Sequence, residues 1–494
     1  MMRSPILPAL LVSFSLVAQE APKAPTKLSL QTAIETSLKN NLQVQIATET
    51  RTSTVAGVMV EQGTFDWNLT SGLTLSKSQD GFKTPAATLE STTQSRSLSV
   101  GSTKAFEWGG NLSLNYTPRY SFSSGSALGG STTTPYDGSL SATYTQSLLR
   151  GFGREATESR LIVARLGAQA ADLTFVKSII DLVASTETLY WDVVFAQRNL
   201  GNKRQTLELA RKQLRENQIR VQVGTLAPIE VTSSEASVAQ REQEIIAAEA
   251  QDLNSKDALI RALYPSSERP AGLELTDAPG VKPMGMDEAT AEKRALASRI
   301  ELKTARLDLK TRQVLETAAV NRTLPQLDAF ATYSGNAASQ IASEGITAVN
   351  KDLSKAAYPG YSIGLQFSMP IQNRAAKGSL AQSRASRRQS ELNLKDLELG
   401  ITLEARQALR NVEASAKGVA AAEKTRYFRE KDLEAEQKKF ENGMSTNFLV
   451  LSKQNDLDTA KSAELQAQIT YAKAITAQEK AVGNLLEARK LVVN

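Results

Sequence analysis

Residues 220–231 read RVQVGTLAPIEV and interrupt a stretch that is otherwise helical in pattern for dozens of residues. Gly224 can adopt a positive φ angle and so end a helix, while Pro228 suits the first turn of the next one. Residues 439–450, KFENGMSTNFLV, break a second long helical pattern around Gly443 in the same way. Each break is therefore predicted to be the turn of a helical hairpin.

The two breaks indicate an internal duplication. Gly443 follows Gly224 by 219 residues, and this offset keeps the two halves in register without a gap over about 158–262. Upstream, LSLQTAIETSLKNNLQVQIA (28–47) resembles MGMDEATAEKRALASRIELKTA (284–305) at a larger offset. The predicted repeats and linker are 28–264, a Pro-, Gly- and Ser-rich segment over 265–285, and 286–494.

Each repeat is predicted to contain a short helix, strands, a long helix, the glycine turn and a further helix. The first repeat has its short helix at about 30–61, its long helix at 154–219 and its last helix at 229–263; the second has a long helix at 374–440 and a last helix at 446–491. Apolar residues of the first long helix recur at spacings of three and four, which is coiled-coil periodicity. A helix of about 66 residues is about 100 Å long, so neighbouring helices, including those of other subunits, must cover its apolar stripes.

Composition excludes several classes of chemistry. The 494 residues include no Cys and no His, which removes thiol nucleophiles, disulfides, the usual zinc sites and histidine bases. The motifs SxxK and GxxxxGK[ST] are absent. The net charge of +6 is spread over interspersed Lys, Arg, Asp and Glu, as on solvated helix faces. We therefore predict a protein that is not an enzyme, holds no cofactor or metal and binds no nucleic acid.

The N-terminus is predicted to be a secretory signal peptide over 1–19, followed by a Pro-containing linker over 20–27. Arg3 precedes a mostly apolar stretch over 6–18, and small residues around Ala18 offer a cleavage site. No later stretch approaches the roughly 18 apolar residues of a spanning helix, but strands of a membrane barrel need only about 9–11 residues.

Alternating segments predict strands. In YSIGLQFSM (361–369) apolar residues occupy one face and small polar residues the other, and FDWNLTSGLTLS (65–76) follows the same rule. KAFEWGG (104–110) reads as a tight turn. The strands fall within about 65–147 in the first repeat, as FDWNLTSGLTLS, RSLSVGS, NLSLNY and SLSATYT, and at 327–335 and 361–369 in the second.

The segments between these strands favour a membrane barrel over a sandwich. Loops are expected at about 79–94, 121–136 and 336–357, and they are long, polar and rich in Gly, Ser and Thr. Long outer loops and short inner turns are typical of transmembrane barrels. The chain has at most six such strands, whereas the smallest closed membrane barrels use about eight. A barrel would therefore need several chains.

Taken together, the sequence resembles the TolC-like outer-membrane efflux proteins. The resemblance depends on the order and duplication of four features: the 28–47 opening, the TQSLLRGFGRE joint (145–155), the PIQNR joint (370–374) and the two glycine breaks. It implies an α+β membrane protein in which a trimer jointly forms a long coiled-coil α-helical barrel and a transmembrane antiparallel β-barrel. That assembly would lie in the outer membrane with a long periplasmic portion.

The resemblance also implies function and partners. The homotrimer would be a passive exit duct of a tripartite efflux or type I secretion system, surrounded by outer-membrane lipid. Its partners would be a periplasmic adaptor (membrane fusion protein) and, indirectly, an inner-membrane pump of RND or ABC type. The family core has four strands per chain, so six strands leave twelve or eighteen per trimer open. The alternative, a periplasmic coiled-coil adaptor outside the membrane, fits poorly because this chain has two hairpins and isolated alternating strands.

Three sets of residues carry the functions that the resemblance implies. The tip turns would dock the adaptor: Gly224, Thr225, Leu226, Gly443, Met444 and Ser445. The periplasmic gate would use residues close to those turns: Glu230, Phe440, Phe448, Leu449 and Ser452. The joints between barrel and helices would use Gly151, Gly153, Arg154, Pro370 and Arg374. Glycines there permit a sharp bend, and the arginines either meet lipid phosphates or cap the joint.

The gate chemistry stays open between three alternatives. The first repeat keeps an acid six residues after its glycine, at Glu230, whereas the second repeat has Leu449 there and Ser452 three residues later. Phe440 stands three residues before Gly443, where the family often has a tyrosine. Glu230 could contact a basic residue such as Lys453, could be an ordinary solvated charge, or could be irrelevant to an apolar constriction at Phe440, Phe448 or Leu449.

Overall fold

The computed structural model describes most of the chain and divides it into two compact units. The described residues are 26–83, 85, 88–125, 136–265, 270, 272–280, 285–341 and 343–491, so the predicted signal peptide and most of the predicted linker lie outside them. The helical unit comprises the chain up to Gln45, Ser178–Ala295 and Glu404–Asn494. The sheet unit comprises Ile46–Lys177 and Leu296–Leu403. Each unit takes segments from both predicted repeats, and the duplication itself stays a prediction.

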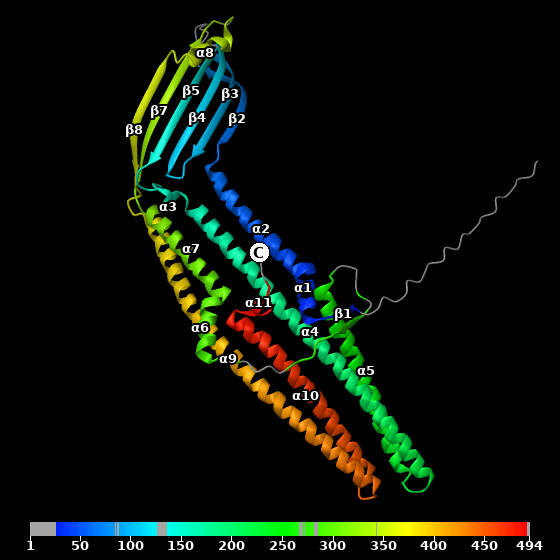
Figure 1. The fold of residues 1–494 in the computed structure, drawn as a ribbon. Helices are drawn as coiled ribbons and strands as arrows, with labels where there is room; N and C mark the ends of the chain where they lie inside the picture. The colour runs from blue at the N-terminus through cyan, green and yellow to red at the C-terminus, as the bar shows by residue number, and fades with distance from the viewer. Residues whose placement is uncertain are drawn as a thin grey trace, which may run out of the picture. The chain divides into compact units, whose positions relative to one another are not determined.

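The sheet unit is built on one antiparallel sheet (Figure 1). Its strands, in spatial order, are β2 (Asn68–Lys83), β3 (Thr88–Ala105), β4 (Gly110–Gly125), β5 (Tyr136–Ser147), β7 (Gln326–Ser339) and β8 (Pro359–Ser368). All six strands of the described residues outside the helical unit therefore join a single sheet, with β2 and β8 at its edges.

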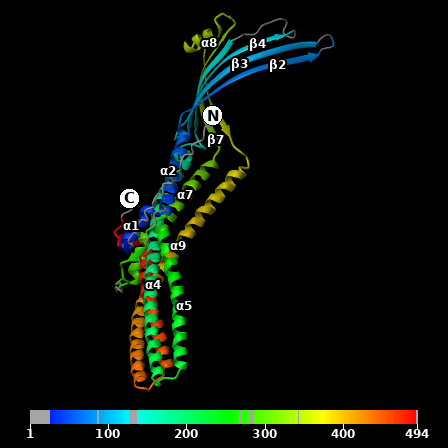
Figure 2. The same cartoon turned by 90° about the vertical axis from the view of Figure 1, so that its right-hand side faces the viewer.

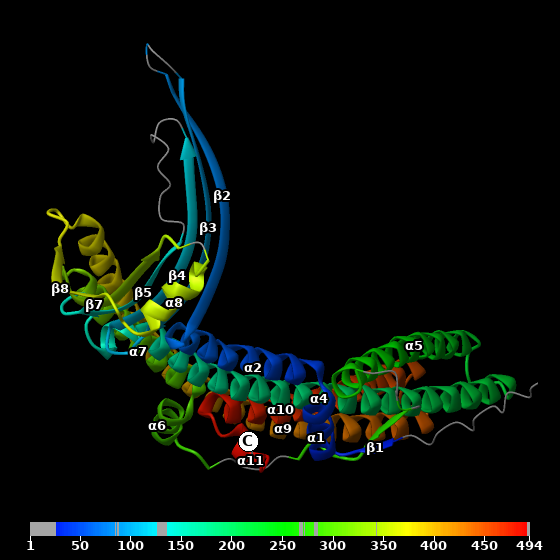
Figure 3. The same cartoon turned by 90° about the horizontal axis from the view of Figure 1, so that it is seen from above.

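All three predicted loops are wrong in part. In 121–136, β4 continues to Gly125, and residues 126–135 lie outside the described residues. Residues 79–94 are mostly paired strand, because β2 continues to Lys83 and β3 starts at Thr88. Small polar residues such as Ser and Thr can continue the ladder, so polarity alone did not mark a loop. In 336–357, β7 continues to Ser339 and helix α8 (Gly345–Ser354) follows. Figures 1 and 3 show α8 beside the end of the sheet.

The two faces of the sheet differ in chemistry. Residues directly opposite one another in an antiparallel sheet share a face, and Leu73 pairs with Leu98 while Ala331 pairs with Ile363. On this apolar face Tyr361 and Ile363 are 87% and 83% exposed. The opposite, polar face carries side chains such as Thr143 and Thr332, whose hydroxyls are 3.0 Å apart.

The helices of the sheet unit are held by ion pairs. They are most of α2 (Leu42–Gln62), α3 (Arg154–Thr157), the start of α4 (Ser159–Gln222), α7 (Ile300–Arg322) and the start of α9 (Arg374–Glu441); the 3₁₀ turn η1 spans Gly63–Phe65. Arg51 of α2 pairs with Asp172 of α4 at 2.6 Å. Arg387 of α9 pairs with Glu316 of α7 at 2.5 Å.

The predicted helix over 30–61 is wrong at one point, because Asn41 divides it. Asn41 has extended backbone (φ −68°, ψ 131°) between α1 (Leu30–Asn40) and α2. Its side-chain oxygen accepts from the amide of Gln43 at 2.8 Å, and its side-chain nitrogen donates to the carbonyl of Ala262 at 2.9 Å. Asn41 therefore caps the second helix and ties it to α5.

The helical unit consists of two hairpins and the segments packed on them (Figure 2). The first hairpin pairs α4 with α5 (Ile229–Leu263), and the second pairs α9 with α10 (Asn447–Val482). The remaining elements are α1, α6 (Glu288–Ser298), α11 (Leu485–Ala488) and a parallel pair of strands, β1 (Thr26–Leu28) and β6 (Leu273–Leu275). The predicted helix 446–491 is too long, because Gly483 (φ 82°) ends α10 in a left-handed cap.

The core of the helical unit gathers around Tyr190 of α4. Its ring is fully buried with Leu259, Leu263 and Ile469. Its hydroxyl hydrogen-bonds Asp277 at 2.8 Å, and burial raises the pKa of Tyr190. Across the described ranges, no helix combines the length and the apolar character needed to cross a membrane.

Candidate functional site

The turn of the first hairpin is closed by backbone hydrogen bonds around Gly224, whose φ is 76°. The amide of Thr225 donates to the carbonyl of Arg220 at 2.9 Å, and the amide of Gly224 donates to the carbonyl of Val221 at 3.0 Å. This is a Schellman motif, which needs a left-handed residue at its centre. Pro228, with φ −56°, then precedes α5.

The turn of the second hairpin repeats this design around Gly443, whose φ is 73°. The amide of Met444 donates to the carbonyl of Lys439 at 2.8 Å. Thr446 caps α10, since its hydroxyl accepts from the amide of Leu449 at 3.4 Å. The hydroxyl of Ser445 donates to Glu436, and this bond, with a further one from Lys439, lowers the pKa of Glu436.

The two hairpins touch next to these turns through Phe440. This side chain is buried with Val450 and Leu457, and Leu226 from the first turn packs against the same cluster. The guanidinium of Arg220 lies 4.9 Å from the centre of the Phe440 ring. Phe440 and Leu226 thus join the hairpins within one chain, with Phe440 buried and Leu226 half-buried.

A buried polar cluster lies beside this apolar contact and was not foreseen from the sequence. We call its four members the Asn217 cluster: Gln213 and Asn217 of α4, Ser234 of α5 and Asn447 of α10. The side-chain nitrogen of Asn217 donates to Ser234 at 2.8 Å and to the Asn447 oxygen at 2.9 Å. Asn217 is 0% exposed, and Ser234 and Asn447 are 1% exposed.

Every side chain of the Asn217 cluster is hydrogen-bonded within the protein. Gln213 donates to the oxygen of Asn217 at 3.1 Å, and Asn447 donates to Ser234 at 3.2 Å. Ser234 in turn donates to the carbonyl of Glu230 at 2.8 Å. Since an unpaired buried amide is costly, these bonds specify one relative position of the two hairpins.

Charged contacts form a second connection farther from the turns. Lys203 of α4 pairs with Glu244 of α5 at 2.8 Å and with Asp458 of α10. Burial opposes its charge, but hydrogen bonds to Asp458 and Glu244 raise the pKa of Lys203. Arg241 of α5 donates to Asn455 of α10 at 2.7 Å, and burial lowers the pKa of Arg241.

The remaining gate candidates occupy different environments. Lys453 pairs with Asp432 at 3.4 Å within the second hairpin, so the structure does not bring it to Glu230 within the chain. Within the described residues the Glu230 carboxylate has no ion pair, while its backbone carbonyl takes part in the network above. Phe448 and Leu449 are 72% and 42% exposed, and Ser452 is half-buried.

The first joint between sheet and helix depends on glycines and on a paired arginine. Gly151 and Gly153 have φ of 85° and 84°. The amide of Gly151 donates to Asn321 at 2.8 Å. Arg154 forms ion pairs with Glu107 at 2.9 Å and Glu158 at 3.2 Å, so this arginine fastens the joint to the protein itself.

The second joint uses an asparagine where the first uses glycine. Asn373 has φ 48°, and its side chain donates to the carbonyl of Thr323 at 2.9 Å. Asparagine tolerates this left-handed conformation better than most residues. Pro370 lies between the end of β8 and this bend, and Arg374 is the exposed first residue of α9.

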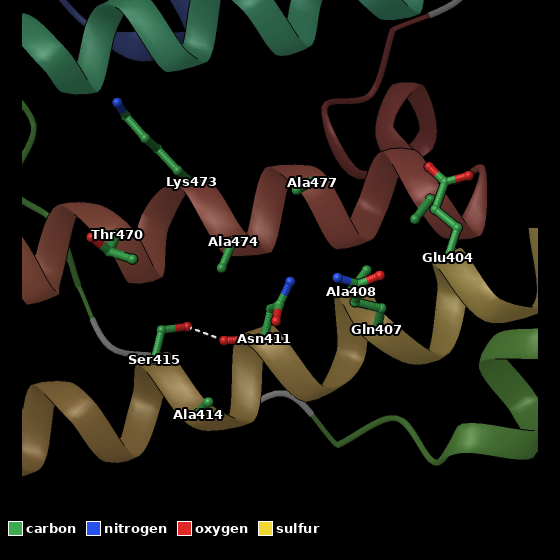
Figure 4. A pocket seen from close by; sticks show the side chains of 11 residues that line it. Glu404, Gln407, Ala408, Asn411, Ala414, Ser415, Thr470, Lys473, Ala474 and Ala477 are labelled. Carbon is green, nitrogen blue, oxygen red and sulfur yellow. Dashed lines mark hydrogen bonds between the residues drawn. The ribbon is translucent and has the colours of Figure 1, made fainter.

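A groove of about 640 Å³ between α9 and α10 is lined mainly by small side chains (Figure 4). Its small side chains include Ala408, Ala474 and Ala477, and the hydroxyl of Ser415 donates to the carbonyl of Asn411 on its own helix. Within the described residues, no group of three or more Asp and Glu side chains is arranged to hold a metal ion. The polar side chains that line the groove include Glu404, Gln407 and Lys473.

Solved structures of outer-membrane proteins share the fold of this chain. The chain is similar to the outer membrane protein VceC of Vibrio cholerae, with a TM-score of 0.68, 14% identity, and coverage of 92% of this chain and 96% of that chain. The CmeC outer membrane channel of Campylobacter jejuni matches with a TM-score of 0.68 and 15% identity, over 98% of this chain and 94% of that chain. The open state of the MtrE outer membrane channel of Neisseria gonorrhoeae matches with a TM-score of 0.63 and 15% identity, over 92% of this chain and 89% of that chain. Identities this low show a shared fold alone.

Comparison with family models decides the family. No curated protein sequence matches the chain. The model of the outer membrane efflux protein family matches residues 110–263 and 292–484, which together exceed half of the chain. These ranges include both glycine turns, the Asn217 cluster and both joints. The chain therefore belongs to the outer membrane efflux protein family and is an efflux channel of the outer membrane.

Proposed function

We propose that three copies of this chain form one passive exit duct, with a β-barrel in the outer membrane and a coiled-coil tunnel in the periplasm. The observation that carries this proposal is the six-stranded sheet with an apolar face, a polar face and two open edges. An open edge leaves backbone amides and carbonyls unpaired, which lipid does not tolerate. Pairing β8 of one copy with β2 of the next removes both edges.

The same sheet supports a barrel of eighteen strands. All six strands of one copy lie in one sheet, so three copies contribute eighteen. The apolar face, with Tyr361, Ile363 and Leu365, would meet lipid, and the polar face, with Thr143 and Thr332, would line water. Exposed apolar side chains on the helices, such as the Tyr427–Phe428 pair, would be covered by neighbouring copies.

The proposed duct is tested by its mass and its conductance. We expect the detergent-extracted protein to have three times the mass of the chain and to form conducting pores in planar lipid bilayers. A monomer recovered from the soluble periplasm would instead support the adaptor alternative, and a trimer without conductance would contradict the duct.

We place the resting gate at the Asn217 cluster. It is the buried polar connection nearest to both turns, and it links α10 to α4 and α5. Phe448 and Leu449 are the side chains that we assign to the pore constriction, because they project from the start of α10 without burial in the chain. Glu230 contributes through its backbone carbonyl, so we assign no acidic ring to this position.

The exposed tip turns are the proposed docking surface for the periplasmic adaptor, which would in turn contact the inner-membrane pump. Gly224, Thr225, Gly443 and Met444 are exposed, and Ser445 is half-buried. Small side chains in this region leave a surface with few protruding groups, on which a helical hairpin of the adaptor can dock. Energy for transport must come from the pump, since the sequence has no nucleotide-binding motif.

Replacing Gly443 by valine is expected to weaken adaptor binding. A β-branched residue at φ 73° is strained by about 1–2 kcal/mol, although a Cβ atom would meet nothing within 4 Å. The turn should therefore change its backbone conformation while the hairpins stay folded. The measurement is the affinity of the purified channel for an adaptor hairpin.

Gly443→Asn is the matched control for this prediction, because asparagine tolerates the left-handed conformation. Its affinity should stay close to that of the parent. Unchanged affinity in Gly443→Val, with an altered turn verified by amide hydrogen exchange, would show that the adaptor docks elsewhere.

A further inference from the structure

Helix α8 is amphipathic and is held firmly on the sheet. Val349 and Leu353 are buried, and they form one cluster with Ala337 of β7, packed against Tyr116 and Tyr136. The hydroxyl of Tyr116 donates to the side chain of Asn350. The contact is close enough that a Cβ atom on Gly138 would lie 2.8 Å from Val349. Glycine at 138 is thus needed for α8 to approach β5.

The strand register shows which face of the sheet α8 covers. Gly138 of β5 pairs with Ala337 of β7, and Leu140 pairs with Tyr116 of β4. The pairing continues outward to both edges, where it reaches Ser71 in β2 and Pro359 in β8. Since directly opposite residues share a face, α8 lies on the apolar face. This is the face of Leu69, Leu73, Tyr361 and Ile363.

The position of α8 along the strands is equally defined. Tyr136 is the first residue of β5 and Ala337 is near the end of β7, so α8 lies at the end of the sheet opposite to the joints. There the rings of Tyr120 and Tyr136 are 5.1 Å apart, and the guanidinium of Arg96 lies 5.9 Å from the Tyr120 ring. Tyrosines with a neighbouring cation are typical of a membrane–water boundary.

The outer side of α8 is polar and basic at its C-terminal end. Lys351 and Lys355 are exposed and one turn apart, and Ser354 between them is also exposed. Asp352 is half-buried, and Glu344 stands before the first residue of the helix, at the opposite end from the lysines. The two lysines and Arg96 therefore place three positive charges toward the same end of the apolar face, where Glu90 of β3 is an exposed carboxylate.

We propose that α8 is an interfacial anchor outside the barrel wall, which lies among the headgroups of the outer leaflet and binds their phosphates through Lys351 and Lys355. The inference rests on the proposed barrel, because only there does the apolar face meet lipid. A helix with an apolar side fixed to the wall and a basic side turned outward fits the boundary between acyl chains and phosphates. In this reading α8 fixes the height of the barrel in the membrane.

Single-cysteine spin labels test the location, and the absence of native Cys makes each label unique. In lipid vesicles whose headgroups chelate Ni²⁺, we expect strong relaxation of a label at Ser354→Cys. A label at Ile363→Cys, on the apolar face, should respond to oxygen dissolved in the lipid. A label at Ser141→Cys, on the polar face, should respond only to a water-soluble relaxant.

These labels separate the inference from the proposed function. If the Ile363→Cys label is in water, the barrel itself is wrong. If that label is in lipid but Ser354→Cys is not relaxed by the headgroup Ni²⁺, the barrel stands and the anchor is overturned.

The charge is tested with lipids of defined headgroups. The parent should retain phosphatidylglycerol in preference to phosphatidylcholine during native mass spectrometry, with each exposed lysine contributing a preference of roughly fivefold. The variant Lys351→Gln/Lys355→Gln should lose this preference, whereas Lys395→Gln/Lys424→Gln in α9 should keep it. An equal preference in both variants would overturn the role of the two lysines.

Discussion

Replacing Asn217 by alanine is expected to open the resting channel. The change removes the donor to the buried Asn447 oxygen and the acceptor of the Gln213 amide, so both of these groups lose a partner. Ser234 keeps its bonds to Glu230 and Asn447. An unsatisfied buried polar group costs about 1–3 kcal/mol, which corresponds to a roughly 5- to 150-fold shift between two conformations. Because the bond from Asn217 of α4 to Asn447 of α10 exists only where the two hairpins lie together, its loss favours their separation. Single-channel conductance and open probability in planar bilayers measure it.

Two variants are the controls for this prediction. Asn411→Ala removes an exposed asparagine of α9 in the same unit, and it should leave the conductance unchanged. Glu230→Ala removes the carboxylate but keeps the carbonyl that Ser234 contacts, so it too should have little effect. A closed channel in Asn217→Ala together with an open one in Glu230→Ala would reverse the assignment and restore the acidic gate.

The glycine turns could be predicted from sequence because their signal is local. A glycine followed by a cap or a proline has few structural readings, and both turns adopt the left-handed conformation that the sequence indicates. Strand alternation is equally local, which is why six strands were foreseeable. The packing of α8 is not a local signal, because Val349 and Leu353 gain their place only from Gly138 and Ala337, some two hundred residues apart in sequence. The polar composition of 336–357 therefore predicts a loop where the structure has this helix.

The Asn217 cluster could not be predicted because its partners come from three helices. A signal existed, since Asn217 lies seven residues after buried Ala210 and Asn447 lies three before buried Val450. Asparagine at a core position of a coiled coil specifies alignment at a cost in stability. What the sequence lacks is the pairing of α4 with α10, and without it a core asparagine has no identifiable partner.

The ion pair of Glu187 and Arg489 is the second contact whose loss should have a large effect. Glu187 interrupts the apolar series of the long helix, and the structure shows it fully buried. Arg489, just after α11, contacts both of its oxygens at 2.6 and 2.9 Å, and Thr476 of α10 donates a further hydrogen bond. The group therefore fastens the C-terminal segment and α10 onto α4.

Arg489→Ala is expected to lower the free energy of unfolding of the helical unit by about 3–5 kcal/mol, because it leaves the buried carboxylates of Glu187 and Glu479 without their cation. Glu187→Ala should cost less, because Arg489 keeps its ion pair with Glu479 at 2.8 Å. The triple variant Glu187→Leu/Glu479→Leu/Arg489→Leu should lose much less than the sum of the single changes, since it removes all three charges. Thermal and urea unfolding of the detergent-solubilised protein, followed by helical circular dichroism, measures the difference. Asp192→Asn breaks the half-exposed Asp192–Lys473 pair on the same two helices and should cost only about 0.2–1 kcal/mol. If Asp192→Asn and Arg489→Ala lose equal stability, the buried ion pairs of Arg489 are no stronger than an exposed ion pair on the same helices.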